Sequence, residues 1–246
     1  MGNASVICAD KTGTLTQNEM TVVAGSIGVH AKFVRKSNNN RERTSNGWTN
    51  ARDFAVDLSN LDSAVTPRLA KLVNDAIAVN STAFEDVDLE SGAAVFVGSK
   101  TETALLEFAK ELGWANYKVT REAANVIQMI PFSSDRKSMG CVVQFPDGSH
   151  RLYIKGASEI LTRKCTRYVV VPCDAANSAP SGKVGTAPIG ESEEDDISRT
   201  ISSYASQTLH TVALCYRDFS HWPPKGMRMM VDNRASRFFP TPILDA

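Results

Sequence analysis

The fold of this chain is decided by Val126-Ile-Gln-Met-Ile130, Met139-Gly-Cys-Val-Val-Gln-Phe145 and His150-Arg-Leu-Tyr-Ile154. These three segments are short and rich in apolar and β-branched residues, which is typical of strands. The last two are separated by Pro146-Asp-Gly-Ser149, a turn sequence that joins antiparallel strands into a hairpin. The middle of the chain is therefore predicted to form three strands, the last two of which make a hairpin.

Helices are predicted before these strands. Thr66 followed by Pro67 is a start signal, and apolar residues then recur at helical spacing to Val79, so a capped helix is expected over Thr66 to Val79. A second helix begins near Thr101, carries an apolar stripe and ends at Gly113. The β-prone composition of Thr21 to Val34 indicates further strands.

The predicted order after the strands is helix, loop, helix and strand. The helices cover Ala157 to Lys164 and Glu191 to Ser206, the loop covers Cys173 to Gly190, and the strand covers Thr208 to Tyr216. The acidic cluster Glu191 to Asp196 fits the positive end of a helix dipole better than a cation site.

The composition excludes several classes of protein. The chain has 246 residues, 27 basic and 27 acidic side chains and 42% hydrophobic residues, which is typical of a globular protein. Its apolar runs are too short to cross a bilayer, so no membrane segment is expected. A net charge of zero gives no support for nucleic-acid binding.

The cysteines and the N-glycosylation sequons do not indicate a disulfide framework, a metal site or a secreted protein. The five cysteines lack a C-x-x-C pair, which favours a reducing compartment over a disulfide framework or a zinc ribbon. The amino terminus does not resemble a secretory signal, so the sequons at Asn3 and Asn80 are interpreted as chance. The polar segment Ser37 to Asn50 is expected to be an exposed connector.

Asp10 is the strongest catalytic candidate. It follows Ala4-Ser-Val-Ile-Cys-Ala9, a buried-strand pattern, and begins Asp10-Lys-Thr-Gly-Thr-Leu-Thr16. A carboxylate there can attack a phosphoryl group while neighbouring donors hold its oxygens, although an isolated Asp after a strand is more often a cap. The seven residues resemble the phosphorylation motif of P-type ATPases at every position.

Three further motifs resemble the same family in the family's order. Phe132-Ser-Ser-Asp-Arg-Lys-Ser-Met139 resembles the segment in which an aromatic ring stacks on adenine and a lysine, here Lys137, lines the pocket. Lys155-Gly-Ala-Ser-Glu159 resembles the motif whose lysine lies by the nucleotide, with Gly156 next to it. Thr101-Glu-Thr-Ala-Leu105 resembles the helix start whose Thr-Glu pair, Thr101 and Glu102, faces the adenine.

Each of these residues also has a simpler interpretation. Phe132 fits a core position beside Met129 and Ile130, and lysines are most often solvated at the surface. Glu102 fits the amino-terminal dipole of a helix. Gly156 fits either a close backbone approach to a ligand or the geometry of a helix start.

Two positions depart from the family pattern. Ser134 and His210 stand where family members carry arginine, the latter in the nucleotide site of the final strand. Arginine supplies a fixed fork of donors to phosphates, whereas a histidine of ordinary pKa is mostly neutral at pH 7. The resemblance therefore predicts weaker nucleotide binding than in an ordinary member.

The resemblance implies a mechanism and cofactors. Asp10 would attack the γ-phosphoryl of ATP, with Lys11 and Thr12 beside it and Mg²⁺ held by Asp10 and Thr12. Thr12 replaces the acid-base Asp of related dehalogenase-type phosphatases, so the aspartyl phosphate would persist. Similarity to plasma-membrane or vacuolar calcium pumps rests on Leu15-Thr-Gln-Asn-Glu-Met-Thr-Val-Val23 and Ala213-Leu-Cys-Tyr-Arg-Asp-Phe219. It implies calcium transport by a full-length membrane protein, in the vacuolar or plasma membrane, with this portion on the cytoplasmic side beside the remaining pump domains.

The expected fold class is α/β with α+β character: an antiparallel sheet flanked by helices, preceded by the first strand of a haloacid-dehalogenase-like phosphorylation domain. The expected domains are residues 1–20 for that strand and loop, 21–222 for the nucleotide-binding domain and 223–246 for a tail without a family pattern. The family's other motifs are not found, so this chain is expected to bind ATP and not to transport. Two alternatives stay open: a noncatalytic nucleotide-binding module and a soluble dehalogenase-type phosphatase.

Overall fold

The computed structural model describes residues 19–35, 54–87, 92–171, 184–224, 231–232 and 237–238. The strand predicted over Ala4 to Ala9, the loop that begins at Asp10 and the connector Ser37 to Asn50 lie outside the described residues.

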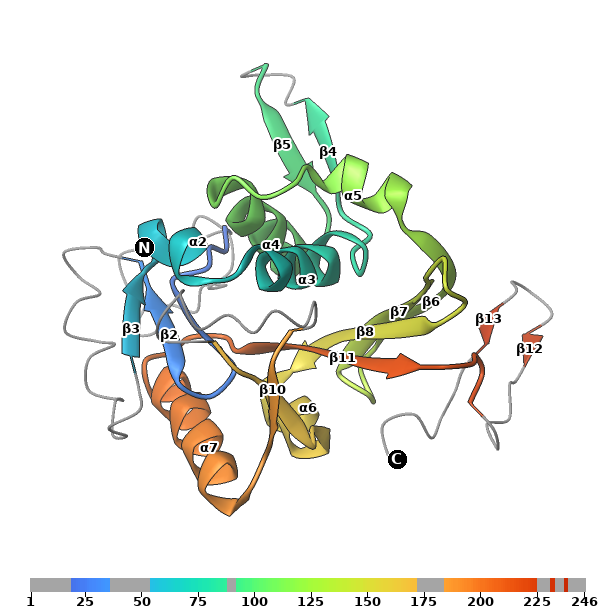
Figure 1. Ribbon diagram of the computed structural model, residues 1–246. Helices are drawn as coiled ribbons and strands as arrows, with labels where there is room; N and C mark the ends of the chain where they lie inside the picture. Colours follow the sequence, from blue (N-terminus) through green and yellow to red (C-terminus); the bar gives the residue numbers. More distant parts are fainter. Residues whose placement is uncertain are drawn as a thin grey trace, which may run out of the picture.

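A four-stranded antiparallel sheet forms the centre of the molecule (Figure 1). The strand order is β11-β8-β7-β6, and the turn between β7 and β8 is the predicted one. The three strands predicted in the middle of the chain are confirmed, and so is an antiparallel sheet combined with helices. The strands are β6 (Asn125–Ser133), β7 (Ser138–Gln144), β8 (His150–Ala157) and β11 (Val212–Phe219).

The prediction for the start of β11 was wrong. The strand was expected from Thr208, but it begins at Val212 because the preceding residues cap helix α7 (Glu191–Ser206). Thr208 has a left-handed φ of 62°, its N–H donates to Ala205 O, and the Leu209 N–H donates to Tyr204 O. This is the hydrogen-bond pattern of a Schellman cap, with threonine in the position that glycine usually takes.

Two helices cover one face of the sheet (Figure 1). Helix α3 (Pro67–Ala78) begins where Thr66 Oγ1 accepts a hydrogen bond from the Leu69 N–H, and helix α4 (Lys100–Glu111) begins at the cap Ser99. Gly113, with a φ of 69°, follows the end of α4. Both predicted helices are confirmed, because their capping residues and apolar spacing agree with the observed ends.

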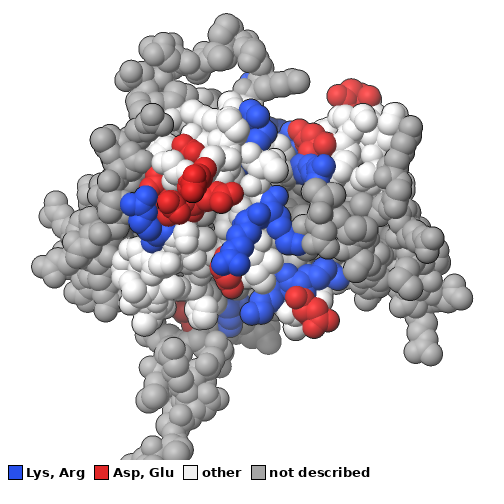
Figure 2. Space-filling view, turned by 90° about the horizontal axis from the view of Figure 1, so that it is seen from below, with Lys and Arg blue, Asp and Glu red and all other residues white. Residues whose placement is uncertain are grey.

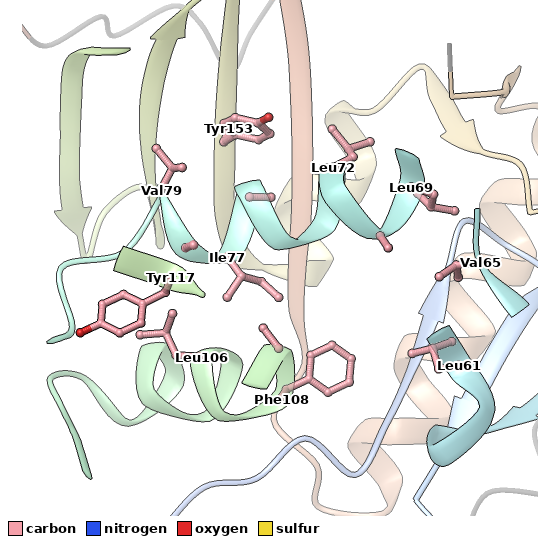
Figure 3. Packing of buried hydrophobic residues seen from close by; sticks show 14 of the residues in the cluster. Leu61, Val65, Leu69, Leu72, Ile77, Val79, Leu106, Phe108, Tyr117 and Tyr153 are labelled. Carbon is pink, nitrogen blue, oxygen red and sulfur yellow. The ribbon is translucent and has the colours of Figure 1, made fainter. Parts of the chain in front are cut away.

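The main core lies between these helices and the sheet. Figure 3 shows side chains of α3 and α4, among them Ile77 and Leu106, meeting between the two helices, with Tyr153 of β8 beside α3. A second cluster, Ile130, Val142 and Leu152, lies on the opposite face of the sheet with Trp222 packed against it. Alternate residues of β7 and β8 therefore serve two cores, as the period of a strand requires.

Smaller elements surround this centre. The segment predicted as a helix over Ala157 to Lys164 contains α6 (Ser158–Leu161) followed by a 3-10 turn, η3 (Thr162–Lys164), and Ala157 itself ends β8. The predicted loop Cys173 to Gly190 contains strand β10, which corrects that prediction. The other elements are β1 (Ala24–Ile27), β2 (Ala31–Val34), β3 (Phe54–Asp57), η2 (Leu58–Asn60), α2 (Leu61–Ala64), β4 (Phe84–Val87), β5 (Ala94–Val97), α5 (Tyr117–Ala123), β9 (Arg167–Val169), β10 (Thr186–Pro188), β12 (Val231–Asp232) and β13 (Arg237–Phe238).

The acidic cluster lies at the start of α7, as predicted. Glu193 Oε2 accepts a hydrogen bond from the Gly190 N–H at 3.0 Å, while Glu191, Glu194 and Asp195 are exposed. Figure 2 views the molecule from below and shows a group of acidic side chains on this face, with basic side chains next to it and across the middle of the view. Within the described ranges, no group of three or more His, Cys, Asp or Glu side chains is placed to hold a metal ion. Glu193 thus caps the helix.

None of the helices in the described part of the chain is both long and apolar enough to cross a bilayer.

Candidate functional site

The structure places the described site candidates at one end of the central sheet. Ser138 of β7 pairs with Gly156 of β8, and Ala157 of β8 pairs with Val212 of β11. Beyond that last pair, the hydroxyls of Ser158 and Thr211 are hydrogen-bonded, so the neighbouring His210 lies near the same corner. Asp10, Lys11 and Thr12 lie outside the described residues.

Lys155 and Glu102 form a buried ion pair between the sheet and helix α4. Lys155 Nζ lies 2.9 Å from Glu102 Oε1, and each side chain is 5% exposed. The Thr82 N–H donates to Glu102 Oε1 at 3.0 Å and the Thr82 hydroxyl donates to Oε2 at 3.0 Å. The carboxylate therefore joins β8, the first turn of α4 and the segment that follows α3.

Burial acts on both charges of this pair. It would raise the pKa of Glu102, but the Lys155 ammonium and the Thr82 donors outweigh it, so the net pKa lies below its ordinary 4.5. Burial lowers the pKa of Lys155, and the Glu102 carboxylate offsets this only in part. The paired, ionised carboxylate is thus the stable form.

The pair gives Glu102 a role inside the protein that the sequence did not predict. The sequence predicts that Glu102 accepts a hydrogen bond from adenine. Its carboxylate already accepts hydrogen bonds from Lys155 and Thr82. Thr82 was missed because its contact with Glu102 spans 20 residues and no local pattern marks it. Ser99, the cap of α4, was also missed, although a serine before an apolar helix is a recognisable signal.

Phe132, Lys137 and His210 are exposed around this corner. The Phe132 side chain on β6 is 61% exposed, so the alternative of a core phenylalanine is wrong. Lys137 lies in the turn between β6 and β7 with a left-handed φ of 47°. Thr101, next to Glu102, is half-buried. The candidates thus form a buried ion pair with an exposed aromatic ring and exposed polar side chains near it.

Gly156 is required by the packing of the sheet. A Cβ atom there would lie 2.3 Å from the Lys137 carbonyl oxygen and 2.7 Å from Ser138 Cβ. The same Lys137 oxygen accepts a hydrogen bond from the Ala157 N–H at 3.0 Å. Gly156 lies within β8, so the helix-start alternative is wrong, and its missing side chain lets the Lys137 turn approach β8 closely.

Asn80 was interpreted as a chance sequon, and its environment agrees. The residue is 1% exposed, and its Nδ2 atom lies 3.5 Å from the Met139 carbonyl oxygen of β7. A buried side chain in this position is not accessible to glycosylation, which acts on exposed loops.

A cavity of about 490 Å³ lies apart from the candidate residues. It is bounded by α3, α5, β7 and β8, and Asn74, Trp114, Val119 and Tyr153 are among its lining residues. None of the site candidates in the described ranges lines it, so this cavity is separate from the end of the sheet where those candidates lie.

Comparison with known proteins identifies relatives. Residues 68–238 match the family model described as P-type ATPase, cytoplasmic domain N. The chain is 52% identical over 230 residues to calcium-transporting ATPase 2 of Cryptococcus neoformans, covering 92% of this chain and 16% of that protein. It is 36% identical over 235 residues to calcium-transporting ATPase 2 of Schizosaccharomyces pombe (92% and 17%), and 34% identical over 227 residues to plasma membrane calcium-transporting ATPase 3 of Homo sapiens (89% and 16%). It spans about one sixth of the length of these relatives.

Removing one partner of the ion pair should destabilise the fold more than removing both. Glu102→Gln leaves the Lys155 ammonium buried without its counter-ion, and Lys155→Met does the same to the carboxylate, so each should cost about 3–5 kcal/mol. The double variant has no buried charge and keeps an acceptor for Thr82. Urea unfolding of the wild type, both single variants and the double variant should show that the double variant loses much less stability than the sum of the two single losses. Additive losses would mean that the pair is not coupled.

The acid stability of the protein should depend on Glu102. Its pKa is lowered in the folded state, so its stabilising contribution is present above 4.5 and is lost as pH falls below that value through the folded pKa. Lys155 stays protonated in both states over this range and adds no slope. The unfolding free energy, measured from pH 6 to about pH 3, should fall more steeply for the wild type than for Glu102→Gln/Lys155→Met. Parallel slopes would contradict the assignment.

Proposed function

The chain belongs to the family of P-type ATPases, in the region of cytoplasmic domain N, and we propose that it binds ATP at the end of the central sheet. The proposed surface includes the exposed residues Phe132, Lys137 and His210. Thr101, Gly156 and the buried pair of Lys155 and Glu102 lie beside them. Residues 21–222 form the proposed nucleotide-binding domain.

The observation that carries the proposal is the exposure of Phe132. A phenylalanine ring that is 61% exposed on a strand of the central sheet leaves apolar area in water, at a hydrophobic cost. A flat base that stacks on this ring would remove that cost and add about 1–3 kcal/mol of stacking. Phe132 is next to Ser133, which pairs with Ser138, and Ser138 in turn pairs with Gly156. The ring therefore lies at the same end of the sheet as Gly156.

Cations near the ring suit the charged part of the same ligand. Lys137 is exposed, and its backbone carbonyl accepts a hydrogen bond from Ala157, so its flexible side chain extends from a fixed point of the chain. Lys155 is 5% exposed and donates to Glu102, so we propose that it supports this surface from inside, next to Gly156, and keeps its charge close to the phosphates. These features support recognition of a base linked to phosphates.

We propose that ATP serves phosphorylation of Asp10. The carboxylate would attack the γ-phosphoryl in line and form an aspartyl phosphate, with Lys11 and Thr12 as neighbouring groups and Mg²⁺ neutralising the phosphates. Asp10 and Thr12 are the proposed magnesium ligands. Support for this step comes from the seven-residue motif and from the family.

Calcium transport is proposed for the full-length protein. The relatives named above are calcium-transporting ATPases, and one is a plasma membrane calcium-transporting ATPase. By analogy, calcium, the remaining pump domains and a vacuolar or plasma membrane are the proposed partners and location. The domain described here would lie on the cytoplasmic side and supply ATP binding.

Phe132→Ala should weaken ATP binding without affecting stability. Loss of stacking should cost about 1–3 kcal/mol, which is roughly a 5- to 150-fold rise in Kd. Phe84→Ala is the matched control, because Phe84 is 50% exposed on the β4–β5 hairpin. Isothermal calorimetry with ATP should show an unchanged Kd for the control. Equal affinities for both variants would remove Phe132 from the site. Phe132 tests binding more cleanly than Lys155, whose substitution also disturbs the buried pair.

His210→Arg should strengthen ATP binding. An arginine adds a permanent charge and a fork of donors next to Ser158 and Thr211, and charged hydrogen bonds contribute about 1.5–3 kcal/mol. His221→Arg is a matched control with the same charge change, because exposed His221 follows the opposite end of β11. Calorimetry at pH 7 should give a lower Kd for His210→Arg alone. An equal gain from both variants would indicate a general charge effect.

A further inference from the structure

Two cysteines meet outside the proposed nucleotide surface. Cys165 Sγ lies 3.4 Å from Cys215 Sγ, although the two residues are 50 positions apart. Cys165 directly follows η3, and Cys215 lies within β11. Both side chains are half-buried, and the proposed ATP chemistry uses neither of them.

The surrounding backbone holds both thiols in place. The Cys165 N–H donates to Thr162 O at 3.1 Å, and its Sγ lies 3.3 Å from the carbonyl oxygen of Leu161. Cys215 is paired with Ile154 in the ladder between β11 and β8. A disulfide has an S–S bond of roughly 2.05 Å, so the two sulfurs would have to approach by only about 1.3 Å. Side-chain rotation of this size leaves the sheet intact.

We propose that Cys165 and Cys215 form a reversible disulfide when the protein reacts with a hydroperoxide. The Cys165 thiolate attacks one peroxide oxygen, the O–O bond breaks, and the other oxygen leaves after proton transfer as ROH, which is water when the oxidant is hydrogen peroxide; this gives a sulfenic acid on Cys165. The Cys215 sulfur then attacks Cys165 Sγ, the S–O bond breaks, and a water molecule leaves. Two thiols are oxidised, one peroxide is reduced, and a dithiol reductant reverses the product.

The positions of the two thiols and their environments assign these roles. Cys165 lies on the connection after η3, whereas Cys215 lies within the β11–β8 ladder. A hydrogen bond with Cys215 lowers the pKa of Cys165, which favours its thiolate, while the pKa of Cys215 is raised by the same bond and by burial. Cys165 is therefore the attacking group and Cys215 the resolving group. Cys141 is an internal comparison, because it is 0% exposed and burial raises its pKa to about 12.

The disulfide would restrain a specific part of the fold. It would close a covalent loop from residue 165 to residue 215 that contains α7, and it would tie the end of the α6–η3 segment to β11. Helix α6 follows β8 directly, so this restraint acts next to the end of the strand that carries Lys155. A closed loop reduces the freedom of the unfolded chain, so the oxidised protein should have a higher Tm than the reduced protein.

The test uses the full chain with Cys8→Ser and Cys173→Ser, which leaves Cys141, Cys165 and Cys215. After treatment with hydrogen peroxide, alkylation and peptide mapping by mass spectrometry, we expect one Cys165–Cys215 disulfide, an alkylated Cys141 upon unfolding, and a Tm several degrees higher. Dithiothreitol should restore the original Tm and both thiols.

Two variants separate the proposed roles. Cys215→Ser removes the resolving thiol, so dimedone should trap a sulfenic acid on Cys165; Cys165→Ser should leave Cys215 largely unmodified. The proposal is overturned if both thiols stay reduced in the folded protein at peroxide concentrations that oxidise glutathione, or if Cys141 is modified first. ATP affinity plays no part in these readouts, so the result is independent of the proposed function.

Discussion

The buried ion pair between Lys155 and Glu102 is the contact on which the arrangement of this molecule depends. A charge that is 5% exposed is tolerated only with a partner, and the Glu102 carboxylate has Lys155 on one side and the two Thr82 donors on the other. Since these groups come from β8, from the first turn of α4 and from the segment after α3, one carboxylate fixes the helices over the sheet. A shift of α4 along the sheet would leave two charges and two donors without partners.

The same constraint positions the proposed ATP surface. Gly156 follows Lys155, and its lack of a side chain lets the Lys137 carbonyl approach β8 and accept from Ala157. The left-handed backbone of Lys137 is held by this contact, at a cost that non-glycine residues usually avoid. The exposed groups are therefore supported by buried ones: Phe132 and Lys137 can change with little effect on the fold, whereas Lys155 cannot.

The parts of the fold that local signals determine are predictable from the sequence. Helix α3 and the central strands follow from capping residues, apolar spacing and a turn sequence, and all of these are visible within about a dozen residues. The start of β11 was misplaced because Thr208 takes the left-handed cap position where a glycine would have been a signal. The contact between Lys155 and Glu102 joins residues 53 positions apart, and only the folded chain reveals that both are buried. The roles of Asp10, Lys11 and Thr12 stay predictions, since they rest on the motif and on the family and these residues lie outside the described ranges.

The ladder between β8 and β11 links the nucleotide proposal to the thiol pair. Side chains alternate along a strand, so Lys155 points toward α4 and its neighbour Ile154 packs on the other face of the sheet. Ile154 is the residue paired with Cys215 of β11. The two chemistries therefore share two strands without sharing a surface. Because Phe132 lies on β6, two strands away from β8 in the order β11-β8-β7-β6, a restraint at Cys215 acts on the β8–β11 side of the proposed surface. In the proposed complex, Phe132 on β6 would stack on the base and His210, just before β11, would lie near the phosphates. A disulfide at Cys215 would therefore restrain the second region without displacing the first.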